Sequence, residues 1–497
     1  MNIANHILCL ILICSHSIAT KAQQAKPNII YILADDLGYG DVSCMNEQSK
    51  IKTTHIDALA KAGMRFTDAH SNSSVCTPTR YGIMTGRYAW RSKLSNGVTW
   101  SYDSSLIEGG RKTVATMLKQ QGYATACIGK WHLGLDWGKD NSGNIDLFKP
   151  IKRGPTTMGF DYFFGITASL DIPPYVYIRN DRITASLIDT IEAAGGKSFW
   201  RKGPIGNDFK HEEVMPKCIE ASIEFIEEQA KKEKPFFLYL PLPAPHTPIL
   251  PTAAYKGKTG TNDYGDFVLM MDDMVEKVID AVKKAGIEEN TMIVFTSDNG
   301  CSPSANFKEL EQAGHSPSYK YRGAKADIYE GGHRIPFIVK WPNQVRSNSV
   351  SDKTISLTDF FATITDLMDQ DIDDNTGEDS YSILPLLTGD KKMYKRNDVV
   401  HHSIDGSFAI RKGKWKLEFC SGSGGWSYPT PEETESHTLP PVQLYNMKSD
   451  ISEQHNRSTS RPMVVKKLTT LMQQQIDNGR SNPGKHQQNA LPIKLLR

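Results

Sequence analysis

The segment 76–87 holds the residues of this sequence that are the strongest candidates for chemistry. It begins with the motif C-T-P-T-R, from Cys76 to Arg80, and continues to T-G-R at 85–87. A cysteine beside a proline that opens a helix is also a common structural arrangement. Taken alone, these residues leave two interpretations open, a reactive position and a buried structural cysteine.

Two short acidic segments are candidates for a metal site. Asp35-Asp36 follows one apolar run and Asp298-Asn299 follows another. An adjacent Asp pair is usually a solvated turn, but two carboxylates at the end of a buried strand repel each other, and a cation relieves that repulsion. The two segments offer only oxygen ligands, which suit calcium or magnesium better than zinc. Each segment alone is a weak indication.

Predicted strands must position these clusters. Apolar, β-rich runs occupy 28–34, 123–128, 236–240 and 292–296, and runs of this kind are typical of strands buried on both faces. Ligands bind beyond the carboxyl ends of the strands in parallel sheets, so we expect the polar residues that follow the runs to form one site. These residues are Asp35, Asp36, Lys130, His132, His246, Asp298 and Asn299.

Helical patterns separate the predicted strands. Two of them, 54–62 and 112–121, end at a glycine suited to a helix C-cap, and two longer amphipathic stretches cover 212–232 and 266–285. This alternation predicts an α/β fold, in which helices flank a large, mainly parallel sheet. We expect a catalytic domain over 23–398 and a smaller C-terminal α+β subdomain over 399–497.

Composition and the N-terminus restrict the class of protein. The chain is 39% hydrophobic and 23% charged, and its formal net charge of +2 gives no sign of an electrostatic hold on nucleic acid. The apolar run 7–13 is too short to cross a bilayer, which needs ~20 apolar residues, and it predicts a signal peptide over 1–22. We expect a secreted or periplasmic protein without a transmembrane segment. Cys14 raises the alternative of a lipidated leader, although Ile13 is bulky where a small residue is expected.

The cysteines do not form a recognisable framework. Cys9 and Cys14 lie in the predicted leader. The others are scattered and include no C-x-x-C pair, which argues against a disulfide scaffold or a zinc ribbon. They are Cys44, Cys76, Cys127, Cys218, Cys301 and Cys420.

The motif at 76–87 resembles the signature of type I, formylglycine-dependent sulfatases, which are arylsulfatase-like members of the alkaline phosphatase superfamily. The other clusters are similar to that family's motifs in the same order, across nearly the whole mature chain. They lie at 27–41, 129–134, 245–248, 296–300, 323–325 and 330–336. Two positions depart from the pattern: Thr79 stands where Ser is frequent, and His333 where an apolar residue is frequent.

The resemblance implies an alkaline phosphatase-like fold and a set of roles. A formylglycine-generating enzyme would convert Cys76 to formylglycine, and one calcium ion would assist the reaction. Arg80 would hold the modified residue, Lys130 and Lys325 the sulfate, while His246 would protonate the leaving alcohol and His132 would take a proton later. The metal ligands implied are Asp35, Asp36, Cys76, Asp298 and Asn299.

The predicted reaction is hydrolysis of sulfate esters on a sulfated carbohydrate. Asp171 and His315 stand in loops that we expect to contact the sugar, together with Lys130, His246 and Lys325. The first alternative is a phosphate or phosphonate ester hydrolase of the same superfamily, although such phosphatases carry Ser or Thr as nucleophile. The second is a catalytically silent carbohydrate-binding protein, which would be expected to have lost some of these residues.

Overall fold

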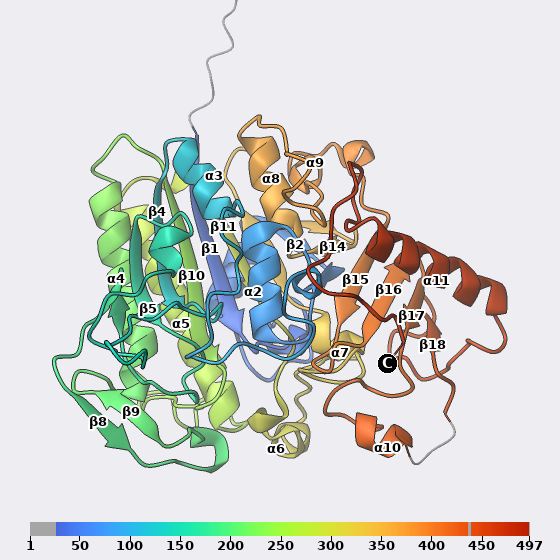
Figure 1. Cartoon of the computed structure of the whole chain (residues 1–497), viewed down its shortest axis with the longest axis horizontal. Coiled ribbons are helices and arrows are strands. Elements are labelled where there is room, and N and C mark those ends of the chain that lie inside the picture. The colour runs from blue at the N-terminus through green and yellow to red at the C-terminus, as the bar shows by residue number, and fades with distance from the viewer. Residues whose placement is uncertain (1–25, 436–438, 497) are drawn as a thin grey trace, which may run out of the picture.

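The computed structural model describes residues 26–435 and 439–496. The leader predicted over 1–22 lies outside the described residues. Figure 1 shows a large sheet with helices packed against it and, on the right, a smaller sheet crossed by α11 (Pro462–Asp477). Within the described ranges, no helix is long and apolar enough to cross a membrane.

The large sheet has ten strands in the order β13-β2-β12-β11-β1-β10-β4-β5-β6-β7. The strands at its centre are parallel, as predicted. They are β11 (Thr291–Ser297), β1 (Asn28–Asp35), β10 (Phe236–Pro245), β4 (Ala124–Lys130) and β5 (Tyr162–Ile166). Every residue of β1, β10 and β11 is buried, which explains why these strands are continuous apolar runs in the sequence.

Antiparallel pairing dominates both edges, so the sheet as a whole is mixed. β12 runs against β11, β2 runs against β12, and β6 and β7 form a short hairpin beside β5. These strands span only two to four residues, too few to leave a pattern in the sequence. Their bounds, with β13, are β2 (Met64–Phe66), β12 (Phe337–Lys340), β13 (Ser349–Ser351), β6 (Ile178–Arg179) and β7 (Arg182–Ile183).

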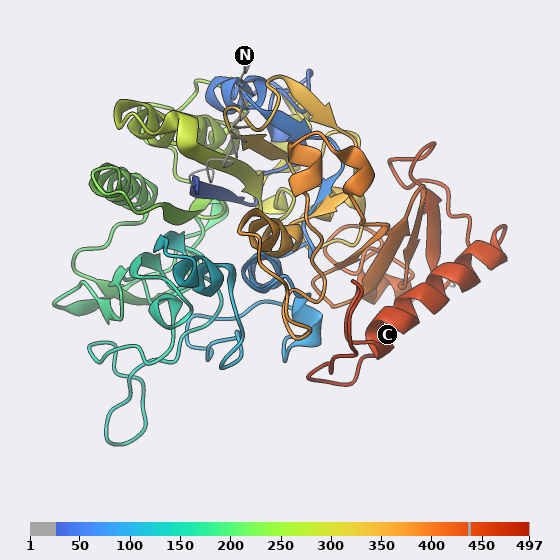
Figure 2. The same ribbon diagram turned by 90° about the horizontal axis from the view of Figure 1, so that it is seen from above.

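Side chains of β1 alternate between two hydrophobic cores. Ile30 and Ile32 face one core, and Ile29 and Leu33 face the other. The first core lies under α1 (Thr54–Lys61), α4 (Val214–Gln229) and α5 (Asp263–Lys284). The second lies under α2 (Cys76–Thr85), α3 (Val114–Gln120) and α8 (Asp359–Leu367). Figure 2 shows these helices on the two sides of the sheet, and the four predicted helices are confirmed as α1, α3, α4 and α5.

The C-terminal part is a separate antiparallel sheet, which confirms the α+β prediction. Its strands lie in sequence order and α11 packs on them through Leu468, Met472 and Ile476. They are β15 (Asp398–His402), β16 (Phe408–Lys412), β17 (Trp415–Glu418) and β18 (Gln443–Asn446). The domain boundary between 398 and 399 stays a prediction.

Shorter elements complete the fold. The hairpin of β8 (Ile188–Ile191) and β9 (Gly203–Gly206) lies at the lower left of Figure 1, beyond the carboxyl ends of the parallel strands. The others are β3 (Ala69–His70), β14 (Ile355–Ser356), α6 (Phe307–Gln312), α7 (Glu330–His333), α9 (Leu384–Leu387) and α10 (Pro431–Glu435).

Candidate active site

The two acidic segments meet because their strands are neighbours. β1 and β11 pair in parallel, and the backbone N–H of Asp298 continues the ladder by donating to the Ala34 carbonyl at 3.1 Å. Asp36 follows β1 with a left-handed φ of 64°, and its own N–H donates to Asp298 Oδ1 at 3.1 Å. Carboxylate oxygens of Asp35, Asp36 and Asp298 all lie within 4.8 Å of one another. The predicted acidic cluster is therefore present at this edge of the sheet.

Three buried cations compensate the three carboxylates. The Arg80 guanidinium reaches Asp298 Oδ2 through Nη2 at 2.7 Å and through Nε at 3.1 Å. Lys130 Nζ lies 2.6 Å from Asp35 Oδ2. Lys325 Nζ lies 2.7 Å from Asp36 Oδ1. These residues come from α2, the end of β4 and the loop before α7, so distant parts of the chain converge at one place.

The nearby cations stabilise the charged forms of the carboxylates to different extents. Burial and the neighbouring Asp35 carboxylate raise the pKa of Asp298 to about 7, although Arg80 opposes the shift. Burial also disfavours the charged form of Asp35, but Lys130, His246 and Arg80 outweigh it and lower the pKa of Asp35 well below its usual value. The cluster is thus crowded with negative charge, a condition that a bound cation relieves.

Unsatisfied oxygens show that the donor set fits a metal ion. Asn299 Nδ2 donates to Asp36 Oδ1 at 2.7 Å, which leaves Asn299 Oδ1 buried without a hydrogen-bond partner among the described residues. Asp35 Oδ1 is likewise buried without a hydrogen bond, with Arg80 Nη2 at 3.4 Å. Buried polar atoms are seldom left unpaired. An all-oxygen set of this kind suits a hard cation.

Cys76 is the first residue of α2 and is only 2% exposed. Its Sγ lies within 4.8 Å of ligand atoms of Asp35 and His246. Burial raises the pKa of the Cys76 thiol, although Lys130 and Lys325 oppose the shift. The unmodified side chain is therefore a protonated thiol at neutral pH and a weak nucleophile.

The two predicted catalytic histidines are held in different ways. His246 Nδ1 donates to the Thr247 carbonyl at 2.6 Å, which directs Nε2 to within 3.6 Å of Asp36 Oδ2. His132 has a left-handed φ of 55°, and its Nε2 donates to the Thr99 carbonyl at 2.9 Å. His132 Nδ1 is buried without a partner among the described residues, so its lone pair is free.

Charge and burial keep His132 neutral. Burial, with Lys130 and Arg80 nearby, lowers the pKa of His132 well below its usual value. The neutral ring has one N–H, which the Thr99 carbonyl fixes on Nε2, and the free Nδ1 is then a proton acceptor. Sequence reasoning missed Thr99, because it lies in a polar loop without periodicity.

The two predicted sugar contacts are already engaged within the protein. His315 Nε2 lies 2.8 Å from Asp41 Oδ1, and His315 Nδ1 accepts from the Lys50 N–H at 3.3 Å. Both ring nitrogens are therefore used. Asp171 lies in the loop after β5 and pairs with Arg201, a residue that the sequence analysis did not single out. Contact of either residue with a sugar stays a prediction.

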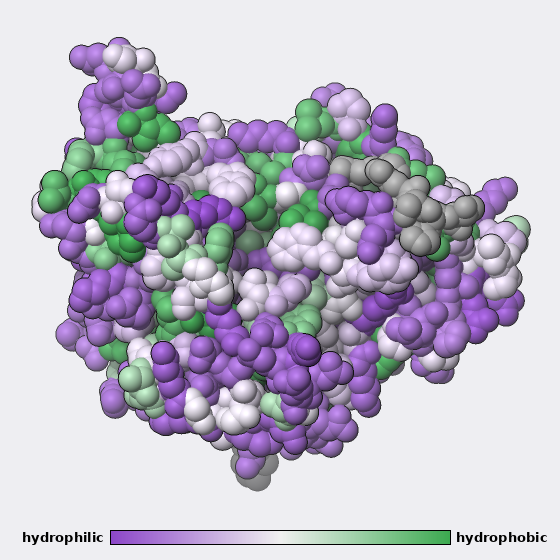
Figure 3. Space-filling view, turned by 90° about the horizontal axis from the view of Figure 1, so that it is seen from below, coloured by the Kyte–Doolittle hydropathy of each residue, from purple (hydrophilic) through white to green (hydrophobic). Residues whose placement is uncertain are grey.

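The surface around this edge is suited to a polar ligand. In Figure 1 the parallel strands point downward, and Figure 3 views the molecule from that side. The face is mainly hydrophilic, with hydrophobic side chains in scattered patches.

Known proteins resemble this chain over nearly its whole length. The family model described as Sulfatase matches residues 27–370. An N-acetylgalactosamine-6-O-sulfatase of Bacteroides thetaiotaomicron is 34% identical over 487 residues, covering 90% of this chain and 93% of that protein. Arylsulfatase G of Canis lupus familiaris is 30% identical over 459 residues, covering 86% of this chain and 80% of that protein.

Solved structures agree with these matches. A sulfatase structure from work on the metabolism of multiple glycosaminoglycans by Bacteroides thetaiotaomicron has a TM-score of 0.80 at 32% identity, covering 90% of this chain and 99% of that one. Ps i-CgsB in complex with k-i-k-neocarrahexaose shares the fold, with a TM-score of 0.71 at 24% identity, covering 93% of this chain and 95% of that one. The resemblance predicted from the motifs is confirmed: this chain belongs to the sulfatase family and is a sulfuric ester hydrolase.

Proposed function

We propose that this sulfatase removes sulfate from a sulfated carbohydrate, with formylglycine at position 76 and one calcium ion. The observation that carries the proposal is the cluster around Cys76, in which three buried carboxylates and the unpaired Asn299 amide oxygen face three buried cations. A structural cysteine has no need of such a set. The sulfatase matches and the presence of every predicted catalytic residue also argue against a silent binding protein.

The residues fit the two groups that the family resemblance implies. Asp35, Asp36, Asp298 and Asn299 would hold the calcium ion together with the modified Cys76, and a formylglycine-generating enzyme would act on the chain during maturation. Bound calcium supplies positive charge that favours a deprotonated nucleophile and screens the sulfate. Hydrated formylglycine supplies two geminal hydroxyls, one for attack on sulfur and one for the later release of sulfate.

The cations of the site select and orient the sulfate group. Lys130 and Lys325 pair with Asp35 and Asp36, and their ammonium groups are the donors that we assign to sulfate oxygens. Arg80 donates two N–H groups to Asp298 and a third to the Lys130 carbonyl, the last at 2.9 Å. Arg80 therefore fixes both Asp298, a proposed metal ligand, and the backbone of Lys130. Lys130, Lys325 and Arg80 are the cationic donors that a chain with a net charge of only +2 offers to sulfate at this position.

The two histidines divide the proton transfers. His246 is the acid that protonates the leaving alcohol, because its Nδ1 is committed to the Thr247 carbonyl and its Nε2 faces the cluster that contains Cys76. His132 is the base that takes a proton in the later step, because its Nδ1 lone pair is free.

The substrate and location follow from the relatives and the leader. The relative with 34% identity is an N-acetylgalactosamine-6-O-sulfatase, so we assign 6-O-sulfated N-acetylgalactosamine as the first substrate to test. The signal peptide predicted over 1–22 supports a location in the periplasm or outside the cell. The substrate assignment is consistent with the hydrophilic face around the site.

A defined substrate panel tests the proposal. Sulfate release is measured from the 6-O-sulfates of N-acetylgalactosamine, galactose and N-acetylglucosamine, with Cys76→Ala as the inactive control and an aryl phosphate as the phosphatase probe. We expect sulfate release from at least the first sugar. Rapid phosphate release with no sulfate release from any sugar would instead support the phosphatase alternative.

A further inference from the structure

Trp100 is an exposed aromatic residue on a backbone segment that hydrogen bonds hold in place. Its side chain is 48% exposed, yet its backbone N–H donates to Asp103 Oδ2 at 2.7 Å. The next residue, Ser101, accepts from Trp137 Nε1 at 2.8 Å through its carbonyl, and its Oγ accepts from Thr167 at 2.9 Å. An isolated exposed aromatic residue needs no explanation. An exposed aromatic residue that belongs to a cluster with other side chains calls for an explanation.

Arg201 completes such a cluster with Trp100 and Phe199. The Arg201 guanidinium carbon lies 5.1 Å from the Trp100 ring centre and 5.0 Å from the Phe199 ring centre, close enough for cation–π contacts with both. Phe199 is 36% exposed and the Arg201 side chain is 40% exposed. We call these three side chains the aromatic platform.

Asp171 and the backbone fix the orientation of Arg201. Its Nη1 donates to the Asp171 carboxylate and carbonyl, and the Arg201 carbonyl accepts from Tyr175 Oη at 2.7 Å. The Nε and Nη2 groups form no hydrogen bond among the described residues, so one edge of the guanidinium is available. That edge carries two parallel N–H groups, the geometry that matches a carboxylate or sulfate.

The aromatic platform lies beside the catalytic histidines on two sides. Thr99, which precedes Trp100, accepts the His132 N–H through its carbonyl and contacts Thr77 Oγ1 at 3.3 Å. The loop that carries Phe199 and Arg201 is tied to the His246 segment, where Ile249 N–H donates to the Lys197 carbonyl at 2.8 Å. The two loops that carry the platform are therefore bonded to the segments that hold the two histidines assigned to the reaction at Cys76.

We infer that the aromatic platform binds the sugar next to the sulfated one and favours an acidic sugar there. Trp100 and Phe199 offer apolar ring faces to the C–H face of a pyranose, and the free guanidinium edge binds its anionic group. This inference rests on the proposed carbohydrate function and adds a second sugar, with a charge, to the substrate. Asp171 is then a positioning residue for Arg201.

Paired substrates test the inference. Sulfate release is measured from 6-O-sulfated N-acetylgalactosamine, from the disaccharide that links it to a hexuronic acid, and from the same disaccharide with its carboxyl reduced to an alcohol. Trp100→Ala should lower kcat/KM roughly tenfold on both disaccharides, mainly by raising KM. Trp and Arg side chains that become buried on binding often contribute this much affinity. The same substitution should leave kcat/KM on the monosaccharide unchanged. Arg201→Ala should lower the rate on the uronate disaccharide and abolish its advantage over the reduced one.

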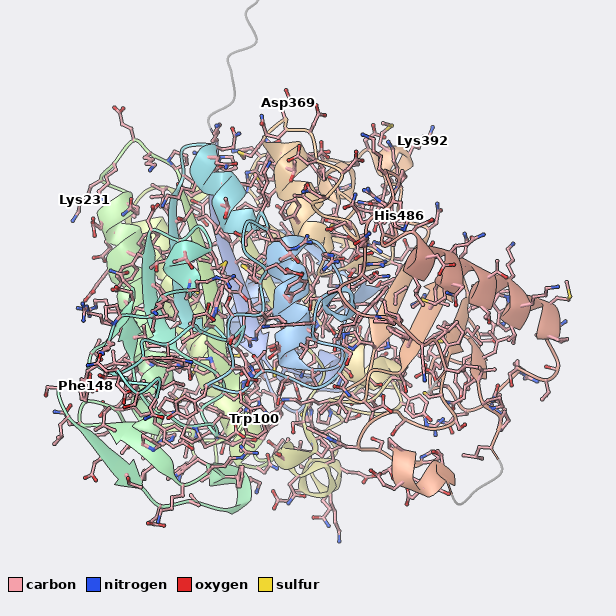
Figure 4. The ribbon with its side chains drawn as sticks, in the orientation of Figure 1. Trp100, Phe148, Lys231, Asp369, Lys392 and His486 are labelled. Atoms are coloured by element: carbon pink, nitrogen blue, oxygen red, sulfur yellow. The ribbon has the colours of Figure 1, made fainter. Side chains whose placement is uncertain are left out.

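Matched controls separate the platform from general surface effects. Phe148 is 51% exposed and lies far from Trp100 in Figure 4, so Phe148→Ala should change none of the three rates. Arg346→Ala is the matched arginine control, because Arg346 is exposed elsewhere on the surface. Equal losses of Trp100→Ala on all three substrates, or no loss on the disaccharides, would overturn the inference.

Binding distinguishes failure of the inference from failure of the proposed function. In the Cys76→Ala background, calorimetry measures the affinity for the uronate disaccharide with and without Trp100→Ala, and the fluorescence change that Trp100→Ala removes reports contact with Trp100. If the wild type releases sulfate from none of the sugars but Trp100→Ala still weakens binding, the platform stands and the proposed substrate fails. If release occurs and Trp100→Ala leaves binding unchanged, the platform is wrong.

Discussion

Cys76 combines deep burial with a raised pKa, so the unmodified thiol is a weak nucleophile and the proposed reaction depends on its modification. We expect the intact mass of active protein to show residue 76 lighter than cysteine, because an aldehyde oxygen replaces the sulfur. Cys76→Ala should abolish turnover and keep the fold, whereas Cys44→Ala should keep activity, since Cys76 and not Cys44 is grouped with Asp35 and His246 among the described residues. Full activity in protein that retains every Cys76 thiol would contradict the proposed nucleophile.

The unpaired oxygens of Asp35 and Asn299 predict the identity of the metal. Elemental analysis should find about one calcium per chain, because oxygen-only ligands favour hard cations. Chelation should remove activity, and calcium should restore it. Stoichiometric zinc, with activity restored by zinc alone, would contradict this assignment and favour the phosphatase alternative.

His246 and His132 are expected to respond differently to the leaving group. His246→Ala should slow hydrolysis of a sugar sulfate by about 100- to 10,000-fold, because the alcohol leaves poorly without a proton. The same variant should lose much less activity on an activated aryl sulfate, because its phenolate leaves without a proton. His132→Ala should slow hydrolysis of both substrates similarly, since the proton transfer that we propose for His132 follows departure of the leaving group. Equal losses for His246→Ala on both substrates would refute its role as the acid.

Sequence motifs singled out residues that the structure brings together, but not the contacts around them. Asp35, Lys130 and Lys325 were predicted because each stands in a short recognisable motif. The pairing of Asp171 with Arg201 was not, because a loop contact between residues thirty positions apart leaves no local pattern. The two ring contacts of His315 were missed for the same reason.

At the scale of elements, the close contact between β4 and β5 positions Lys130. A Cβ added at Gly165 would lie 1.8 Å from the Gly129 carbonyl oxygen, inside the sheet and next to Lys130. Gly165→Ala should therefore destabilise the protein by about 1–3 kcal/mol and reduce activity, because the two strands must separate. Gly109→Ala, where nothing lies within 4 Å, is the matched control. Thermal unfolding measures both, and equal stability of the two variants would contradict the expected clash.

Elements were predictable where burial dictates the residue pattern. β1 and β11 are buried on both faces and stand out as apolar runs, and α5 was recognised by its amphipathic period. The edge strands β6 and β7 were not predicted, because two-residue strands have no period to detect. The β8–β9 hairpin was missed because its exposed residues alternate weakly.

At the scale of the whole molecule, a buried histidine cluster links the C-terminal sheet, through β15, to β3 and α7 of the larger part of the chain. His70, His333 and His401 are fully buried, and the rings of His333 and His401 stack at 3.8 Å. Charged groups surround them: Asp68, Glu330, Arg334, Arg411 and Lys416. Burial and Arg334 lower the pKa of His70 from 6.5 to about 4, and burial also lowers the pKa of His333 and of His401.

This cluster predicts a loss of stability in acid. As the pH falls, the unfolded state protonates such a histidine near pH 6.5, whereas the folded state protonates it only near pH 4. The contribution to stability is therefore full above about pH 6.5 and is lost as the pH falls toward 4. Each such histidine contributes a slope of about 1.4 kcal/mol per pH unit in that window. His401→Gln should reduce the slope of stability against pH by the contribution of one histidine. His486 is exposed and is labelled in Figure 4, and His486→Gln should leave the slope unchanged. Denaturant unfolding at several pH values measures the slopes, and an unchanged slope in His401→Gln would contradict the prediction.

The central position of β1 also affects when the protein folds. β1 is the first strand to be synthesised, yet both of its partners, β10 and β11, come more than two hundred residues later. The middle of the sheet therefore cannot close until residue 297 has emerged, and loop closure over such distances is slow. Until then the segment at 76–80 stays outside the core in which it ends. The strand order would thus give the proposed maturation enzyme access to Cys76 while residues 77–297, somewhat less than half of the chain, are synthesised.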